Sequence, residues 1–128
     1  MKYLITYILI IFYTSTLLWA QNYEKEGYIA IDSTSGRGKY LTISLEKEQN
    51  CVAVYIEEKS ENCRLKEYQI ERLEGVKWVV ISRCKRENSG EFITFKPQEI
   101  KKLRLHFLKA EKMPNISKLI IYGNISNR

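Results

Sequence analysis

The side chains that could do chemistry are few and poorly arranged for catalysis. The 128-residue chain holds a single histidine, His106, and no recognisable nucleophile motif. A catalytic nucleophile needs a base within hydrogen-bond reach, itself oriented by a third group, and His106 is expected on the solvent side of a strand. Glu57 and Glu58 are neighbours at the end of an expected strand, so their carboxylates point to opposite faces and make a poor pair for glycoside hydrolysis. The sequence therefore predicts a protein that is not an enzyme.

Neither the spacing of possible metal ligands nor the distribution of charge indicates a metal site or a strongly acidic partner. No C-x-x-C spacing accompanies the single histidine, which argues against a zinc site. The formal net charge is +6, but Lys and Glu are interspersed along the chain. This pattern favours a solvated surface over a strongly acidic partner. We expect no metal cofactor and no nucleic-acid partner.

The first twenty residues have the layout of an export signal. Lys2 precedes an apolar run over residues 3–13, and Ala20 is a small residue at the expected cleavage position. An uncleaved membrane anchor is the alternative, because the segment comes close to the length of a bilayer span. Hydroxyl residues dilute the segment, however, and no basic cluster follows it. The pattern predicts a signal peptide over residues 1–20 and a secreted, periplasmic or extracellular domain over residues 21–128 with no membrane span.

The remainder of the chain has the pattern of short β-strands cut by polar turns. Residues 40–45 and 101–108 alternate between apolar and polar, and the inward positions are Leu41, Ile43, Leu45, Leu103, Leu105 and Phe107. Other strands are expected at residues 28–31, 51–56, 67–73, 78–82, 92–95 and 116–122, with turns at 46–50 and 74–75 and a strand end at Pro97. No window has the period of a long helix. We therefore expect one all-β domain, an antiparallel β-sandwich or barrel, with Trp78 and Phe95 in the core.

An antiparallel meander would bring four loops together at one end of this domain. These loops are residues 32–39, 57–63, 83–90 and 109–115. Cys63 and Cys84 fall in two of them, whereas Cys51 begins a strand at the other end. In an oxidising compartment a Cys63–Cys84 disulfide with Cys51 as a buried thiol is favoured, and three reduced cysteines are the alternative.

The same end gathers polar side chains that could bind a ligand. Arg, Asn and carboxylate groups bind sugar hydroxyls in planar, bidentate fashion, usually with an aromatic face under the ring. The candidates are Asp32, Arg37, Glu57, Glu58, Asn62, Arg64, Arg83, Arg86, Asn88 and Asn115. No aromatic platform is evident, since only Tyr40 borders these loops. For each candidate a solvated loop role is the simpler alternative.

Six segments in order carry a resemblance to a known family. They are residues 41–49 (LTISLEKEQ), 52–58 (VAVYIEE), 64–71 (RLKEYQIE), Gly75 followed by Trp78, 102–107 (KLRLHF) and 114–122 (PNISKLIIY). Together they resemble the discoidin-like family, the coagulation factor five/eight type C group, and most of all the C-terminal domain of α-L-fucosidases. The resemblance implies a galactose-binding-like jelly roll, shortened at its N-terminus, whose loop end carries the ligand.

Two departures from the family limit what the resemblance implies. The family usually has a longer N-terminal portion with an acidic stretch that contributes to a calcium site, whereas residues 32–36 are at best a remnant, so no calcium cofactor is expected. The loop after Ser82 is short and basic, so no particular sugar specificity is implied. We expect a secreted, non-catalytic binding module that recognises a carbohydrate or cell-surface glycan. The alternative is an exported protein–protein interaction or structural sandwich domain without sugar binding.

Overall fold

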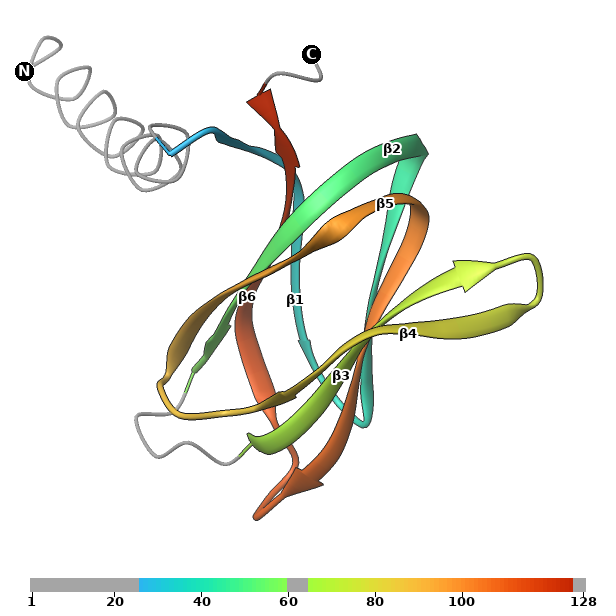
Figure 1. Cartoon of the computed structure of the whole chain (residues 1–128). Helices are drawn as coiled ribbons and strands as arrows, with labels where there is room; N and C mark the ends of the chain where they lie inside the picture. Colours follow the sequence, from blue (N-terminus) through green and yellow to red (C-terminus); the bar gives the residue numbers. More distant parts are fainter. Residues whose placement is uncertain (1–25, 60–64, 126–128) are drawn as a thin grey trace, which may run out of the picture.

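The computed structural model describes residues 26–59 and 65–125 and shows an all-β antiparallel domain (Figure 1). Its strands are β1 (Tyr28–Arg37), β2 (Tyr40–Glu58), β3 (Leu65–Glu74), β4 (Lys77–Lys85), β5 (Gly90–Ala110) and β6 (Asn115–Asn124). They form one hydrogen-bonded sheet in the order β1-β6-β2-β5-β3-β4, and every pairing is antiparallel. The predicted fold class is confirmed.

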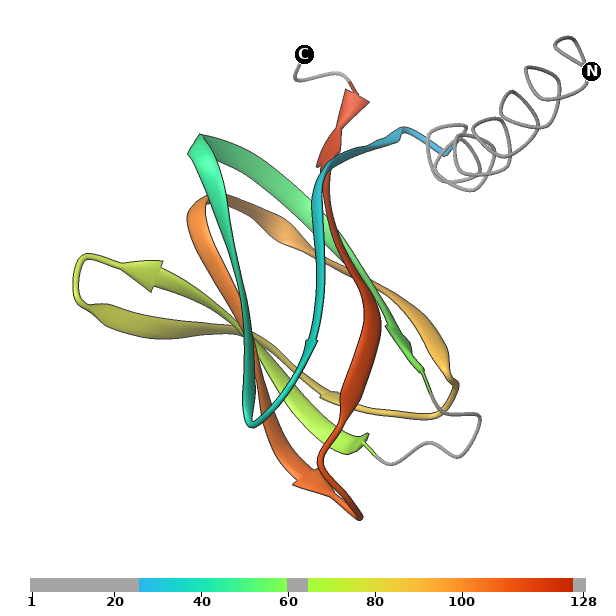
Figure 2. The same ribbon diagram turned by 180° about the vertical axis from the view of Figure 1, so that it is seen from behind.

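The sheet curls into two layers because β2 and β5 are long and bent. β5 pairs with both halves of β2, whereas β6 pairs only with the second half of β2 and β3 only with the second half of β5. One layer therefore contains β1, β6 and one half of each long strand, and the other contains β3, β4 and the remaining halves. Figures 1 and 2 show β2 and β5 bending together at one end of the domain.

The expected turn at residues 46–50 and the expected strand end at Pro97 are both wrong. They are bends inside continuous strands, because Asn50 and Cys51 still pair with β5 across the bend. The register shift that follows Cys51 places a bulge around Pro97. Proline has no N–H to donate, so it is tolerated at a bulge, where the ladder is already interrupted.

The expected loop over residues 32–39 is mostly strand. β1 continues to Arg37 because it pairs with β6 along its whole length, from Tyr28 opposite Asn124 to Arg37 opposite Asn115. Only Gly38 and Lys39 connect it to β2, and Gly38 has a φ of 137°, which a glycine adopts without strain. The strand thus extends several residues beyond its apolar start.

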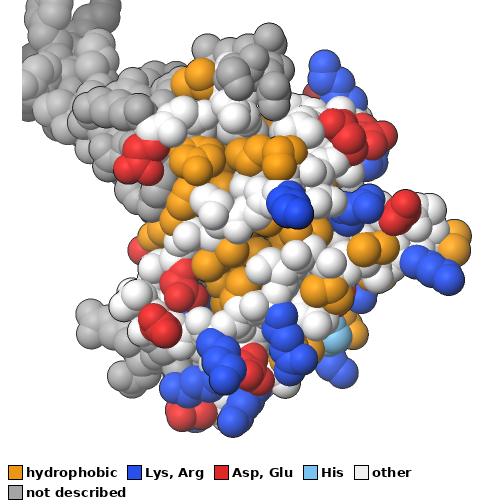
Figure 3. Space-filling view, viewed as in Figure 1, with side chains coloured by type: hydrophobic (Ala, Val, Ile, Leu, Met, Phe, Trp, Pro, Cys, Tyr) orange, Lys and Arg blue, Asp and Glu red, His pale blue; other side chains and the backbone are white. Residues whose placement is uncertain are grey.

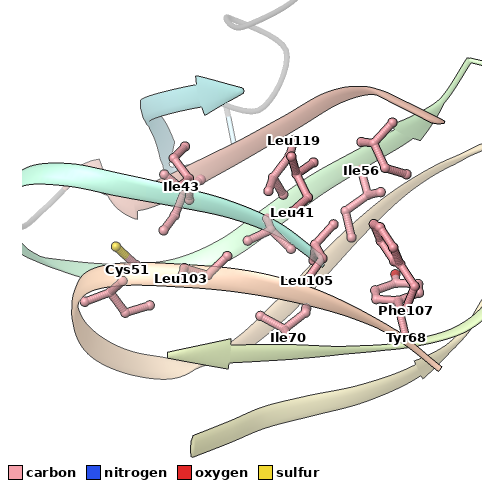
Figure 4. Close-up of a cluster of buried hydrophobic side chains, with 14 of the residues drawn as sticks. Leu41, Ile43, Cys51, Ile56, Tyr68, Ile70, Leu103, Leu105, Phe107 and Leu119 are labelled. Carbon is pink, nitrogen blue, oxygen red and sulfur yellow. The ribbon is translucent and has the colours of Figure 1, made fainter. Parts of the chain in front are cut away.

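The core lies between the two layers and follows the predicted alternation. Leu41, Ile43, Leu45, Leu103, Leu105 and Phe107 are all buried, and the residues between them are not. Figure 4 shows the labelled members of this set converging with Ile70 and Tyr68 of β3 and with Ile56 and Leu119 of the other layer. Phe95 packs against this core as expected.

Trp78 is not part of the core, contrary to expectation. It begins the return strand of the β3–β4 hairpin, where Gly75 at a φ of 64° forms the predicted turn. Its side chain is half-buried on the outer face of the layer, under the guanidinium of Arg104. The cation–π contact with Arg104, which reaches across β3 from β5, covers the ring of Trp78 without a place in the core.

Candidate functional site

The loops expected at one end of the domain meet there. Arg37 lies opposite Asn115, and Glu57 lies opposite Gly90. Backbone hydrogen bonds join the connections: Lys59 N donates to Asn115 O at 2.8 Å, and Glu58 N donates to Ser89 O at 3.0 Å. We call the turn at residues 38–39 with the loops at 86–89 and 111–114 the loop end; it lies at the bottom of Figure 1. Its assembly confirms the predicted strand directions.

A buried ion pair holds the loop end together. The side chains of Arg86 and Glu58 are both fully buried, with Nη1 and Oε1 3.8 Å apart. Arg86 Nη2 also donates to the Ser89 carbonyl, and the Leu65 N–H donates to Glu58 Oε1 at 3.2 Å. These contacts tie the end of β2 to the loop after β4 and to the start of β3. Both residues were candidates for ligand contact, and their burial gives them a structural role instead.

The other candidates are dispersed. Arg37 and Asn88 are exposed at the loop end, and Glu57 lies there with its carboxylate 3.7 Å from Lys118 Nζ. Asp32 sits within β1, opposite Ile121, where its carboxylate accepts the Ser33 N–H. Arg83 is exposed on edge strand β4. Asn62 and Arg64 lie outside the described residues. The structure thus brings Arg37, Glu57 and Asn88 to one end and leaves Asp32 and Arg83 away from it.

A shallow basic groove of about 440 Å³ opens beside the loop end. Its lining residues are Lys66, Glu67, Lys85, Arg86, Lys109, Ala110 and Glu111. Besides the buried Arg86, which Glu58 neutralises, three lysines face two carboxylates. One of these surface pairs, Lys66 Nζ to Glu111 Oε1, is 3.6 Å long. Figure 3 shows Lys and Arg side chains gathered at this end of the molecule. Sequence reasoning missed the groove because strand pairing, not spacing, joins the ends of β3, β4 and β5.

A second cluster of polar and aromatic side chains lies on the outer face of the layer that holds β3 and β4. The outer-face cluster consists of Tyr40, Glu71, Trp78, Arg104 and His106. Arg104 Cζ stands 4.4 Å from the centre of the Tyr40 ring and 4.2 Å from that of Trp78. The Tyr40 and His106 rings stack at 4.6 Å. An aromatic platform is therefore present, although its members come from strands rather than from the loops.

Glu71 is the buried centre of this cluster. Its carboxylate accepts three hydrogen bonds: from Arg104 Nε at 2.5 Å, from His106 Nδ1 at 3.1 Å and from Gln69 Nε2 at 2.9 Å. Burial by itself would raise the pKa of Glu71, but the hydrogen bonds from Arg104 and His106 and the positive charge of Arg104 outweigh burial and lower that pKa below its ordinary value of 4.5. The carboxylate is therefore ionised at neutral pH.

This lowered pKa makes the contribution of Glu71 to stability pH-dependent. A carboxylate whose pKa is lower in the folded state stabilises the fold above its ordinary pKa, and the contribution is lost as the pH falls through the folded-state value. We expect Glu71→Gln to lower the free energy of unfolding by about 1.5–3 kcal/mol at neutral pH, since charged hydrogen bonds are lost. Urea unfolding should show this difference shrinking between about pH 5 and about pH 2. A difference that is the same at both ends would contradict the charged network.

The cysteine expectations have different outcomes. Cys51 is buried as expected, and burial, with a smaller effect of Glu99, raises the pKa of its thiol to about 12. Cys84 lies within β4 rather than in a loop, has a free thiol, and its sulfur is 3.6 Å from Ser82 Oγ. Cys63 lies outside the described residues. The Cys63–Cys84 bridge is not confirmed and stays a prediction.

The described part of the chain has neither a metal-binding cluster nor a membrane-spanning helix. In residues 26–59 and 65–125, no three His, Cys, Asp or Glu side chains are grouped in a way that could hold a metal ion. Over the same ranges there is no helix long and apolar enough to cross a bilayer.

Comparison with solved structures supports the sandwich architecture. A region of a protein described as an α-L-fucosidase, from Bacteroides thetaiotaomicron, superposes with a TM-score of 0.68 and 30% sequence identity over 73% of this chain. A family 32 carbohydrate-binding module of C. perfringens NanJ, solved with galactose, matches at 0.59 and 14% identity over 77% of this chain. A chitosan-binding module of a Paenibacillus chitosanase/glucanase, solved with chitotriose, matches at 0.55 and 18% identity. No family model and no curated protein matches the chain.

The matched lengths separate two kinds of neighbour. This chain spans only 22% of the Bacteroides fucosidase, but 95% of the NanJ module and 76% of the chitosan-binding module. The domain is thus an antiparallel β-sandwich of the kind found in carbohydrate-binding modules and as a part of larger fucosidase chains. Among the described residues, both the loop end and the outer-face cluster present groups of polar side chains.

Proposed function

We propose that the protein is a non-catalytic binding module that recognises a carbohydrate through its loop end. The observation that carries the proposal is the match with a galactose-bound module over almost the whole of that module's length. The loop end adds exposed Arg37 and Asn88 and the adjacent basic groove, which are hydrogen-bond donors suited to sugar hydroxyls. Ligand sites on such sandwiches lie on loops that a rigid scaffold holds in place.

Substitution at the loop end tests the proposal. For a glycan that binds the full chain, Arg37→Ala is expected to weaken binding about tenfold or more, because a charge-assisted hydrogen bond contributes about 1.5–3 kcal/mol. Lys77→Ala is the matched control, because it removes an exposed cation at the β3–β4 hairpin, away from the loop end. Equal affinities in Arg37→Ala, Asn88→Ala and the control would contradict a loop-end site. Such a result would favour the alternative, an exported domain that docks on another protein.

We also propose that the protein is exported and that cleavage follows Ala20. The supporting pattern is the charge of Lys2, the apolar run over residues 3–13 and the small residue at position 20. Mass spectrometry of the secreted product should give an N-terminus at Gln21. Recovery of the intact chain in the membrane fraction would contradict cleavage.

A further inference from the structure

The outer-face cluster is better organised than a solvated sheet face requires. Its side chains come from neighbouring strands: Tyr40 from β2, Arg104 and His106 from β5, Glu71 from β3 and Trp78 from β4. They face away from the core, because Leu41, Leu103 and Leu105 beside them point inward. The guanidinium of Arg104 contacts both the Tyr40 ring and the Trp78 ring. An outer face thus presents aromatic and planar polar groups held in fixed positions.

The buried carboxylate beneath the cluster fixes the hydrogen-bonding roles of its exposed members. An ionised Glu71 only accepts hydrogen bonds, so His106 Nδ1 must carry the proton in the 3.1 Å contact. In the neutral imidazole, Nε2 is then an acceptor. Arg104 uses Nε on Glu71, and no other hydrogen bond joins its guanidinium to a described residue. The Nη donors of Arg104 and the Nε2 acceptor of His106 therefore remain for a ligand.

Exposure distinguishes this cluster from an ordinary packing arrangement. Tyr40 keeps 41% of its surface open, and the Arg104 and His106 side chains keep 21% and 23%. The carboxylate that orients them is only 5% exposed. Exposed groups that a buried partner holds in place lose little conformational entropy when they bind, and such preorganisation is characteristic of binding sites.

We propose that the outer-face cluster is a second carbohydrate-binding surface, which takes a neutral oligosaccharide across the strands. Tyr40, 41% exposed beside the His106 ring and the Arg104 guanidinium that pack against it, supplies aromatic surface for the apolar side of a sugar ring. Arg104 and His106 supply a donor and an acceptor for its hydroxyls. The charges of Arg104 and Glu71 balance each other, whereas the groove at the loop end is basic. The balanced charges of the cluster favour an uncharged ligand there.

The register of the strands extends this surface beyond one ring. Tyr40 lies opposite His106, His106 opposite Gln69, and Gln69 opposite Arg83. This row crosses the layer from β2 to the edge strand β4 over about 14 Å, since neighbouring strands are about 4.8 Å apart. The row matches an oligosaccharide better than a single sugar, and the exposed Arg83 lies at its far end, beyond the charge-balanced pair of Arg104 and Glu71.

Tryptophan fluorescence can test the proposal in the full chain. The sequence has two tryptophans, and the proposed cleavage after Ala20 removes Trp19, so Trp78, within the cluster, is the only reporter in the processed protein. In the uncleaved chain, Trp19→Phe gives the same single reporter. The probes are the neutral oligosaccharides cellohexaose, laminarihexaose and mannohexaose. At least one is expected to shift the Trp78 emission in a saturable way. No saturable change with any of the three, in a protein with native circular dichroism, would overturn the proposal.

Variants of Tyr40 separate the ring from its surroundings. Tyr40→Phe should retain the affinity of the fluorescence response within a few-fold, whereas Tyr40→Ala should weaken it about tenfold or more, because only the latter removes the aromatic face. Val76→Ala is the matched control, because Val76 is an apolar residue 94% exposed at the turn of the β3–β4 hairpin. Binding that Tyr40→Ala leaves unchanged would overturn the proposal. Binding lost in Arg37→Ala and kept in Tyr40→Ala would assign the probe to the loop end and equally overturn it.

Discussion

Glu58→Ala is expected to lower the free energy of unfolding by about 3–5 kcal/mol, because it leaves the charge of Arg86 buried without its partner. Both side chains are fully buried, 3.8 Å apart at Nη1 and Oε1. Arg86 Nε and Nη1 have no hydrogen-bond partner among the described residues, so the ion pair is what offsets the burial of this charge. Chemical denaturation at neutral pH measures the loss.

Two further variants distinguish the ion pair from general damage at the end of β2. Glu57→Ala, the neighbouring residue, should change stability by well under 1 kcal/mol, because its ion pair with Lys118 is solvent-exposed. The double variant Glu58→Leu with Arg86→Met should recover much of the loss, since apolar residues of similar volume can replace a buried ion pair. A Glu58→Ala protein as stable as Glu57→Ala would contradict a stabilising role for the buried Arg86–Glu58 ion pair.

Leu105→Ala is expected to lower the free energy of unfolding by about 2–5 kcal/mol, because it opens a cavity in the middle of the core. Leu105 is fully buried and lies opposite Leu41 of β2 and Ile70 of β3. In Figure 4 its side chain points among those of its neighbours in the core. The residue thus joins the strands that carry the outer-face cluster to the rest of the sandwich.

Leu108→Ala on the same strand is the matched control for this prediction. Leu108 is 36% exposed, so the same truncation leaves no comparable cavity, and the expected change is within about 1 kcal/mol. Thermal or urea unfolding of both variants measures the two losses in the free energy of unfolding. Equal losses at the two positions would show that Leu105 does not occupy a packed core.

The sequence pattern predicts which faces of the strands are buried between the layers, but it does not predict the bends within β2 and β5. Alternation predicted the buried face of residues 40–45 and 101–108, because one buried face imposes a period of two. The polar residues 46–50 and Pro97 predict breaks, yet β2 and β5 resume their pairing at Gln49 and Asn50 after an irregularity at residues 45–48. Local composition does not reveal such pairing, because it depends on a partner far away in the chain.

Side-chain pairing across the sheet explains why the candidate site was only partly predictable. Arg86 follows a polar strand end and has the pattern of an exposed loop cation, but Glu58 buries it from another strand. Tyr40, Trp78 and Arg104 lie far apart in the sequence and meet only after β2, β5, β3 and β4 align. Arg37 and Asn88 were predictable because their place at the loop end follows from strand direction alone.

Two binding surfaces on one small sandwich would give the protein avidity for a polymer. Linked sites raise the effective concentration for the second contact, provided that both can engage one ligand. The loop end and the outer-face cluster share β5, whose Phe107 N–H donates to Lys39 O next to Tyr40. A glycan that engages both would bind more tightly than either site alone allows.

The most direct test of the central claim is a glycan array probed with the purified protein, with and without calcium. The account predicts specific, saturable binding to at least one class of glycan, unaffected by calcium and weakened by Arg37→Ala. A blank array from a protein shown to be natively folded would contradict carbohydrate recognition and leave docking on an exported protein as the function to pursue.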